Sequence, residues 1–520
     1  MKKEVEHNSL YSNVKVLDCT LRDGGYINNW NFGKNVIKNI VHDLVNAKTD
    51  YIELGFLRNE EYDENRSVFN SINQIKKLVP NDAIISKFVG MILYTDYDIS
   101  KLEENDGVID MLRITFHKYD YLDGIKYCRQ VIDKGYKVFI NPINITGYSD
   151  GELLALINEV NDIKPYGFSI VDTFGALTKE DLFRIYYIIE NNLDSSIVIG
   201  LHLHENLSMS LLLAQSFLEV KKPTRSCIID GSLYGIGRNP GNLCIELIMN
   251  HMINYYDKNY SLEYVLDAID NYIEPIKENS KWGYSKEYYL SGKNKVHRNY
   301  AEYFSKKGRL TARGLNNLLQ KISIANKDKF DEKYAELIYR EYMNYRVDDS
   351  ITYKEIKTKI EGKKVILIAP GPSSSEAQNI ISKFNEQYIV FSLNFIPTSI
   401  NIDYVFFSNI KRYKEYLLYL EERRLIVTSN ILREENVNGL IINYESLMEP
   451  TYVDSCGILL LRLLIKIGIK EVYLIGFDGF NNDKNYVEDH YGKIVNGRDD
   501  TEKIIIEYER IKSLINVVYF

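Results

Sequence analysis

A regular alternation of short apolar runs with longer amphipathic segments fills the first half of this 520-residue chain and limits its fold more than any other feature. Segments with helical periodicity, such as residues 36–47 and 153–163, follow runs of strand length. The runs are apolar throughout, which predicts parallel strands buried on both faces. Eight strands, each followed by a helix, predict a (β/α)8 barrel, because that fold needs about 250 residues. The predicted strands are residues 14–17, 51–54, 83–91, 111–115, 137–140, 167–171, 197–201 and 226–229.

The composition indicates a soluble protein of more than one domain, because 520 residues are too many for a single core. The net charge of −8 argues against a nucleic-acid-binding protein, which would carry a basic surface. Five scattered cysteines without a CxxC pair favour a reducing compartment. The N-terminal residues lack an apolar signal-peptide core, and no long apolar run occurs. We therefore expect a cytoplasmic protein without a membrane span.

Polar residues follow the predicted strands, where a barrel presents its active site. The first strand leads into Arg22 and Asp23, which two glycines follow. Glu53 lies near the end of the second strand, and His117 comes directly after the fourth. A turn with a surface ion pair is the alternative for Arg22 and Asp23. His117 is either a general base or a packed core histidine.

His202 and His204 follow the seventh strand and give the sharpest signal of a site. Residues two apart on a strand point to the same face, so both imidazoles can reach one point. Two imidazoles with a carboxylate such as Asp23 make an open site for a divalent metal. A pair of surface histidines is the alternative. Asn242 ends a glycine-rich run that closes the barrel as a turn, and it can also reach the metal.

Six motifs in this half of the chain resemble the pyruvate-carboxyltransferase-like, or DRE-TIM metallolyase, superfamily. They are LDCTLRDGG, IELGF, LRITFHK, DTFG, LHLHENL and DGSLYGIGRNPGN, and they span about residues 14–255. The resemblance implies a (β/α)8 barrel with a divalent metal, Mn²⁺ or Mg²⁺, with Zn²⁺ as an alternative. It implies Asp23, His202 and His204 as ligands, with Asn242 as a further one.

Within that superfamily the chain looks most like the 4-hydroxy-2-oxovalerate aldolases. The resemblance implies a 2-keto acid such as pyruvate and an aldehyde as substrates, with Arg22 stabilising the enolate. Tyr26 stands where those aldolases carry a histidine base, so Tyr26, His117 or a water transfers the proton. Glu53 joins the catalytic candidates on its position alone.

The acyl-CoA-condensing synthases of the same superfamily are the alternative. They carry Glu-Gln after Arg-Asp-Gly, where this chain has Gly25 and Tyr26. They also carry Gly-Glu-Arg before the final Gly-Asn, where this chain reads Gly237-Arg238-Asn239. The missing synthase residues favour an aldolase.

Residues 256–355 have mostly helical patterns and form a predicted extension and linker. Trp282-Gly283-Tyr284 and the aromatic residues near 288 suggest packing over the barrel mouth. Such a cap forms a dimer in some members of the superfamily, so a homodimer is one expectation. His297 is a weak candidate for closing the site, and packing alone explains the rest.

Residues 360–520 predict a Rossmann-like α/β domain with strands at 364–369, 389–393, 404–407, 425–427 and 471–475. The first strand leads into Gly371-Pro372-Ser373 and then a helix, which makes an anion-binding corner. A plain helix cap is the alternative for any one of these loops.

The run KVILIAPGPSSSE, with FSLNF, YVFFSN, EVYLIGFD and DHYG further on, resembles bacterial sialyltransferase-like glycosyltransferases and pterin pyrophosphokinase-like domains. This implies a bound nucleotide or nucleotide-sugar. The chain would then be an aldolase fused to a nucleotide-binding domain, in surface-polysaccharide biosynthesis. A bifunctional aldolase/glycosyltransferase and a barrel that only scaffolds the second domain are the alternatives. The implied contacts are Gly371, Ser373, Asn394, Asn409, Asp478 and His490, which matches the sialyltransferase base.

Overall fold

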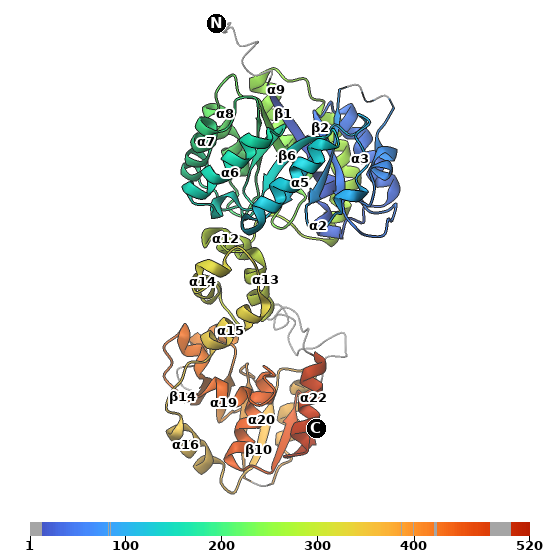
Figure 1. The fold of residues 1–520 in the computed structure, drawn as a ribbon. Coiled ribbons are helices and arrows are strands. Elements are labelled where there is room, and N and C mark those ends of the chain that lie inside the picture. The colour runs from blue at the N-terminus through green and yellow to red at the C-terminus, as the bar shows by residue number, and fades with distance from the viewer. Residues whose placement is uncertain are drawn as a thin grey trace, which may run out of the picture. The chain divides into compact units, whose positions relative to one another are not determined.

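The computed structural model describes residues 13–81, 83, 85–385, 387–398, 400–420, 424–478 and 501–520. The chain packs into two compact units, residues 1–298 and 299–520 (Figure 1). The segment 256–355, expected as one helical extension, is therefore shared between both units. In the described part of the chain, no helix has the length and apolarity needed to cross a membrane.

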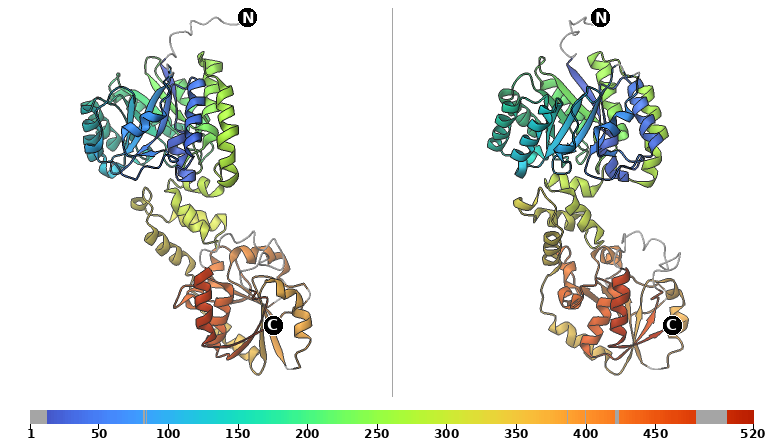
Figure 2. Two further views of the ribbon diagram at one scale, coloured as in Figure 1. Left: turned by 90° about the vertical axis from the view of Figure 1, so that its right-hand side faces the viewer. Right: turned by 45° about the vertical axis from the view of Figure 1, so that its right-hand side comes forward.

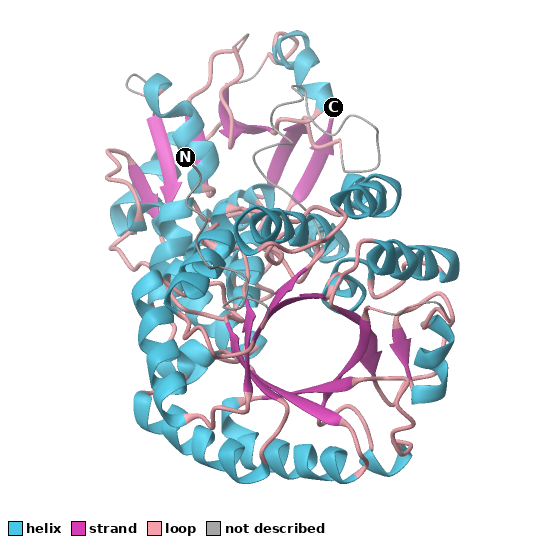
Figure 3. Ribbon diagram, turned by 90° about the horizontal axis from the view of Figure 1, so that it is seen from above, coloured by secondary structure: helices cyan, strands magenta, loops and turns pink. Residues whose placement is uncertain are grey.

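The first unit is a closed barrel of parallel strands, as predicted (Figure 3). Each strand pairs with its neighbour in sequence order, and β1 closes the ring by pairing with both β2 and β9. A short strand, β3 (Val68–Phe69), lies beside β2 outside the ring. The barrel strands are β1 (Val14–Asp18), β2 (Tyr51–Leu57), β4 (Lys87–Leu93), β5 (Met111–Phe116), β6 (Lys137–Pro142), β7 (Gly167–Val171), β8 (Val198–His202) and β9 (Cys227–Gly231).

Helices surround the ring and bury one apolar face each against it. In α3 (Lys34–Asn46) that face is Ile37, Ile40, Val41 and Leu44, which recur at helical spacing. The other large helices are α5 (Tyr121–Asp133), α6 (Asp150–Ile163), α7 (Lys179–Asn192), α8 (Ser210–Val220) and α9 (Ile245–Tyr256).

The expectation of a helix after every strand is wrong in one place. Between β4 and β5 the described residues form only the single turn η2 (Ile99–Lys101). The connection after β2 is also short, with α4 (Ile72–Ile75) and η1 (Lys76–Leu78). The segment between β4 and β5 is rich in Asp and Glu and has no apolar stripe, so it cannot pack as an amphipathic helix.

Four short helical segments continue the first unit: α10 (Leu262–Ala268), η6 (Ile269–Ile273), α11 (Glu274–Asn279) and α12 (Lys286–Lys293). The last of them packs on loops at the carboxyl ends of the strands. The Asn206 side-chain amide donates to the Tyr288 carbonyl at 3.1 Å, and the Trp282 indole donates to the Tyr234 carbonyl at 3.0 Å. Residues 282–293 therefore cover part of the edge where the predicted site lies.

The second unit contains a parallel sheet (Figure 2). Its strand order is β14-β13-β12-β11-β10-β15-β16. Five of its strands were predicted. The two others, β14 and β16, are short edge strands with few buried side chains, so the sequence signal is weak there. The strands are β10 (Lys364–Ile368), β11 (Tyr388–Leu393), β12 (Tyr404–Phe407), β13 (Arg424–Thr428), β14 (Leu440–Ile442), β15 (Glu471–Ile475) and β16 (Asn516–Tyr519).

The strand order reverses between β10 and β15, because the chain runs outward from β10 to β14 and then returns to the other side. Open parallel sheets bind ligands at such a reversal, beyond the carboxyl ends of the strands. The helices of this unit are α13 (Arg298–Lys306), α14 (Ala312–Gln320), α15 (Glu332–Met343), α16 (Ser350–Ile360), α17 (Ala377–Ile381), α18 (Ile410–Tyr416), α19 (Tyr444–Met448), α20 (Cys456–Ile467) and α22 (Thr501–Lys512).

Candidate metal centre and a second cleft

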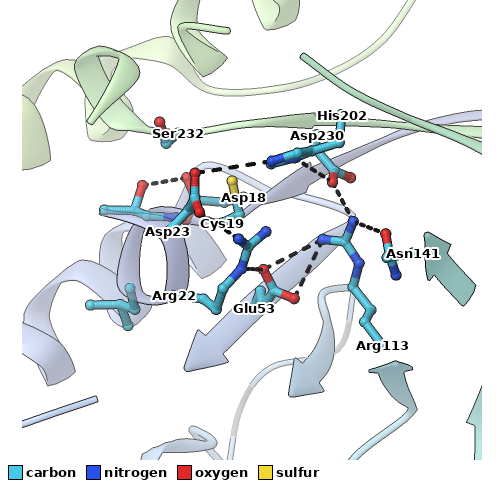
Figure 4. Close-up of polar contacts among 12 residues, drawn as sticks. Asp18, Cys19, Arg22, Asp23, Glu53, Arg113, Asn141, His202, Asp230 and Ser232 are labelled. Atoms are coloured by element: carbon cyan, nitrogen blue, oxygen red, sulfur yellow. Dashed lines mark hydrogen bonds and ion pairs between the residues drawn. The ribbon is translucent and has the colours of Figure 1, made fainter. Parts of the chain in front are cut away.

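A tight turn after β1 brings Asp23 into the barrel mouth (Figure 4). The Thr20 backbone N–H and hydroxyl donate to the Asp18 carboxylate at 2.9 and 2.8 Å, which fixes the direction of the chain. The short helix α1 (Thr20–Asp23) follows, and all of its residues are buried. The sequence Asp-Cys-Thr-Leu-Arg-Asp therefore makes the turn with its first carboxylate and presents the second.

His202 ends β8 and His204 follows it, and both meet Asp23 from two strands along the ring, because only β9 lies between β8 and β1. Nε2 of His204 lies 3.7 Å from Asp23 Oδ2, and Nε2 of His202 lies 4.0 Å from it. The ligand atoms of the three residues all lie within 4.8 Å of one another. Each ring is oriented through its other nitrogen: His202 Nδ1 donates to Asp230 at 2.9 Å, and His204 Nδ1 donates to the Asp172 carbonyl at 2.8 Å. Such partners leave both Nε2 atoms directed at Asp23.

Two buried oxygens in this cluster fit a divalent metal. Asp23 Oδ2 and Asn242 Oδ1 have no hydrogen-bond partner. A buried polar atom in that state costs about 1–3 kcal/mol, so such atoms are rarely left without a ligand. The Asn242 side-chain N–H donates to the Ile236 carbonyl at 3.2 Å, which leaves its oxygen as the open end. Two imidazole nitrogens, a carboxylate and an amide oxygen are a donor set for Mn²⁺, Mg²⁺ or Zn²⁺.

The protonation states also fit a metal site. Burial opposes ionisation of Asp23, but the Arg22 guanidinium and the two imidazoles hold its pKa well below the usual range. Burial lowers the pKa of His202 despite the Asp230 carboxylate beside it. Metal binding needs an ionised carboxylate and a neutral imidazole, and these environments favour the ionised form of Asp23 and the neutral form of His202.

Arg22 is held next to the metal ligands by two carboxylates. Its Nη1 lies 2.5 Å from Asp23 Oδ1, and its Nε donates to Glu53 at 2.7 Å. Burial opposes its charge, yet Glu53 and Asp23 raise the pKa of Arg22 well above its usual value. Glu53 is completely buried in β2 and contacts Arg22 rather than the metal ligands. It therefore positions Arg22.

A buried network that the sequence reasoning missed connects Arg22 to His202. Arg113, in β5, lies 3.4 Å from Glu53 and also pairs with Asp230, which holds the His202 ring. Its Nη2 donates to Asn141 Oδ1 at 2.8 Å (Figure 4). Arg113 and Asp230 are charged residues within otherwise apolar strands. Because charged residues are rarely buried without a partner, their positions could have indicated this network from the sequence.

The two candidate bases lie at the rim. Tyr26, in α2 (Gly25–Asn28), is 39% exposed, and its ring packs edge-on against Trp30 with centroids 4.8 Å apart. The His117 ring stacks on Tyr119 at 5.0 Å, and its backbone N–H donates to Asp120. A catalytic role for either residue stays a prediction.

The second unit contains a cleft of about 1110 Å³ at the carboxyl edge of its sheet. Helices α13 and α15 form one wall, and the loops after β10, β11, β12 and β15 form another. Four of the predicted nucleotide contacts line it: Gly371, Asn394, Asn409 and Asp478. His490 lies outside the described residues.

The predicted phosphate loop is closed by contacts within the protein. The Ser373 N–H donates to Asp478 Oδ2 at 3.0 Å, and the Ser373 hydroxyl accepts from the Gly476 N–H at 3.0 Å. Asn409 caps α18 by accepting from the Lys411 N–H, and its amide donates to the Gly308 carbonyl. The Ser373 contacts join the loops after β10 and β15, on the two sides of the strand-order reversal.

Arg309, which the sequence reasoning missed, reaches the cleft from the loop between α13 and α14. It pairs with Asp454 at 2.7 Å, and the Tyr444 hydroxyl donates to the same carboxylate at 2.7 Å. Arg309 and Asp454 are 145 residues apart, so no local pattern marks their contact. Among the described residues, the aromatic side chains that line the cleft are Tyr303, Phe330, Tyr339, Tyr444, Tyr452, Phe477 and Tyr508.

Comparisons with known proteins agree with the barrel. Residues 121–271 match the HMGL-like family model. An oxaloacetate decarboxylase of Mycobacterium tuberculosis is 26% identical over 249 residues, which are 45% of this chain and 68% of that protein. A 2-isopropylmalate synthase of Oceanobacillus iheyensis is 22% identical over 255 residues, 45% of this chain. The chain spans 47%, about half, of that synthase.

A solved structure shows the same fold. It is the N-terminal domain of an aldolase candidate from Bacteroides vulgatus, with a TM-score of 0.50 and 24% identity. The match covers 56% of this chain and 96% of that domain.

Proposed function

We propose that this chain, which contains an HMGL-like domain of the DRE-TIM metallolyase superfamily at residues 121–271, is a divalent-metal-dependent aldolase acting on a 2-keto acid. The supporting observation is the cluster of Asp23, His202 and His204, whose ligand atoms lie within 4.8 Å of one another while Asp23 Oδ2 has no hydrogen-bond partner. A metal held there supplies Lewis-acid stabilisation of the keto acid's developing negative charge. Pyruvate is the simplest keto acid of this class.

Arg22 supplies a second positive charge beside Asp23. Because Glu53 fixes its guanidinium, Arg22 needs no rearrangement to offset charge on an enolate oxygen. In the condensation direction, the methyl carbon of pyruvate loses a proton and bonds to the aldehyde carbon. The aldehyde oxygen takes up a proton, and the product is a 4-hydroxy-2-keto acid. Cleavage runs through the same steps in reverse.

An acyl-CoA-condensing synthase is the second candidate, since several similar proteins are 2-isopropylmalate and citramalate synthases. The absence of their Glu-Gln and Gly-Glu-Arg residues favours the aldolase. An assay with pyruvate and either acetyl-CoA or an aldehyde separates the synthase from the aldolase. Release of the coenzyme A thiol and consumption of the keto acid are measured in each mixture. Release of coenzyme A would favour the synthase.

Exchange of pyruvate methyl protons in D2O with Mn²⁺ tests the enolate chemistry without the second substrate. His202→Ala should slow exchange by about 100-fold or more, because metal-site substitutions at even the outer positions cost 10–100-fold. His42→Ala is the matched control, since the side chain of His42 on α3 is 63% exposed. Equal exchange by all three proteins would refute the proposal.

The cleft in the second unit supports a further proposal, that it binds a nucleotide or nucleotide-sugar. Its position at the strand-order reversal and its aromatic lining suit a ring-containing ligand. Calorimetric titration of the full-length protein tests this. The ligands are CMP, other nucleoside monophosphates and CMP- or UDP-sugars. Asp454→Asn should weaken binding, because Asp454 holds both Arg309 and Tyr444 at the cleft. Absence of binding to every probe would remove the assignment.

A place in surface-polysaccharide biosynthesis, a cytoplasmic location and a homodimer stay proposals. They rest on the pairing of the two domains, the sequence and the resemblance. Cell fractionation tests the location, and light scattering of the purified protein tests the dimer.

A further inference from the structure

Arg238 comes directly after a glycine that lies against the candidate metal ligands. It follows Gly237, where an added Cβ would lie 2.3 Å from Asn242 Nδ2 and 3.0 Å from Asp23 Oδ2. The chain therefore passes directly over the metal ligands before it reaches Arg238. The guanidinium carbon of Arg238 is 5.5 Å from the centroid of the Tyr26 ring, on the rim of the same mouth.

Arg238 differs from the other arginines of the mouth in having no counter-charge. Arg22 and Arg113 each pair with carboxylates. The contacts of Arg238 within the described residues are the Tyr26 ring and Nε2 of His297, and no ion pair is among them. Its Nε is buried without a hydrogen-bond partner. A half-buried guanidinium in this state is unusual, because burying a charge is unfavourable unless it is paired.

The surroundings of Arg238 are positive as well. Arg238 Nη2 donates to Nε2 of His297 at 3.2 Å, so this nitrogen carries no proton. Burial, together with the charges of Arg238, Arg298 and His117, lowers the pKa of His297 to about 3. Arg298 donates to the Asn239 carbonyl at 2.8 Å and so braces the residue next to Arg238. An anion placed here would gain favourable electrostatic energy and satisfy the open Nε.

We infer that Arg238 binds a carboxylate or phosphate group of the aldehyde that the barrel joins to its keto acid. This inference rests on the proposed aldolase function. Arg22 and the metal ligands already account for the charges of the keto acid at the floor of the mouth. Arg238 lies at the rim beside Tyr26 and His297, where the far end of a second substrate would project. The acceptor is therefore an anionic aldehyde.

Steady-state kinetics with matched aldehydes test the inference. The pairs are succinic semialdehyde with butanal, and glyceraldehyde 3-phosphate with glyceraldehyde. The wild type should prefer the anionic member of at least one pair by about tenfold or more in kcat/KM, which a charge-assisted hydrogen bond can supply. Arg238→Gln should lose that preference through KM, and Arg238→Lys should keep part of it. Arg129→Gln, at a surface position with 56% side-chain exposure, is the control and should keep all of it.

Binding of inorganic phosphate gives a readout that needs no turnover. Calorimetry should detect phosphate binding to the wild type, and Arg238→Gln should weaken it by about tenfold. Three results would overturn the inference: no preference for either anionic aldehyde, equal loss with neutral and anionic aldehydes in Arg238→Gln, or a raised KM for pyruvate in the exchange assay. The last result would assign Arg238 to the keto acid. Failure of the wild type to exchange pyruvate protons would instead refute the aldolase proposal.

Discussion

At the scale of single residues, the barrel mouth is a set of charges that neutralise one another in pairs. Glu53 forms ion pairs with Arg22 and Arg113. Asp230 pairs with Arg113 and contacts the His202 ring. Burial opposes ionisation of Asp230, yet Arg113 and His202 keep its pKa below the usual range. Each buried charge is thus satisfied by a neighbour, as buried ions require. Some buried atoms of the mouth lack a hydrogen-bond partner instead: Asp23 Oδ2, Asn242 Oδ1 and Arg238 Nε. We propose a metal as the ligand of the two oxygens and an anion as the ligand of Arg238.

The low pKa of His297 predicts a pH dependence of stability. The folded pKa of about 3 lies below the ordinary 6.5, so acid protonates this histidine in the unfolded chain first. Its contribution is therefore complete above pH 6.5 and is lost as the pH falls toward 3. The loss is at most about 1.4 kcal/mol per pH unit. Unfolding measured from pH 7 to 5 should show a shallower decline for His297→Gln than for the wild type. Identical slopes would contradict the predicted burial of a neutral ring.

At the scale of elements, the loop between β9 and α9 closes over the metal ligands because glycine occupies position 237. A Cβ there would overlap the Asn242 amide, so Gly237→Ala must displace Asn242, Asp23 or the loop itself. We expect Mn²⁺ affinity to fall by about tenfold or more, since displaced ligands and their supports cost 10–100-fold. Gly151→Ala on α6 is the control, because an added Cβ there meets no atom within 4 Å. Titration with Mn²⁺ measures the affinity of each variant. Equal affinities of the two variants would show that the loop moves to accommodate the added Cβ without displacing the ligands.

The strands themselves were readable from the sequence, and the side-chain pairings across the barrel were not. Continuous apolar runs marked all eight barrel strands, because parallel strands are buried on both faces. Asp23, His202 and His204 were predicted as candidate ligands because metal ligands have restricted chemistry at the ends of strands, and the structure brings their ligand atoms within 4.8 Å of one another. Arg113 and Asp230 are 117 residues apart, and only the closed ring brings them together. The missing helix between β4 and β5 shows the same limit, since a barrel connection can be long without being helical.

At the scale of the whole molecule, each unit has its own hydrophobic core. The barrel core includes Ile40, Ile52 and Leu201, and the core of the second unit includes Ile366, Val405 and Val427. In the second unit, buried Arg462 on α20 pairs with Glu507 on α22 at 2.7 Å and donates to the Leu447 carbonyl at 2.6 Å. Because each unit has its own core and its own internal ion pairs and hydrogen bonds, we expect the two units to unfold as separate cooperative units.

Calorimetric unfolding of the full chain should therefore show two transitions that respond to different changes. Mn²⁺ at about 100 times its Kd should stabilise only the barrel transition, by about 2.7 kcal/mol, because it binds only the folded site. Glu507→Ala should lower only the other transition, since leaving Arg462 buried and unpaired costs about 3–5 kcal/mol. Glu502→Ala is the matched control, because Glu502 lies on the same helix and its side chain is exposed. A single transition that shifts as a whole in both experiments would mean that the two cores fold as one.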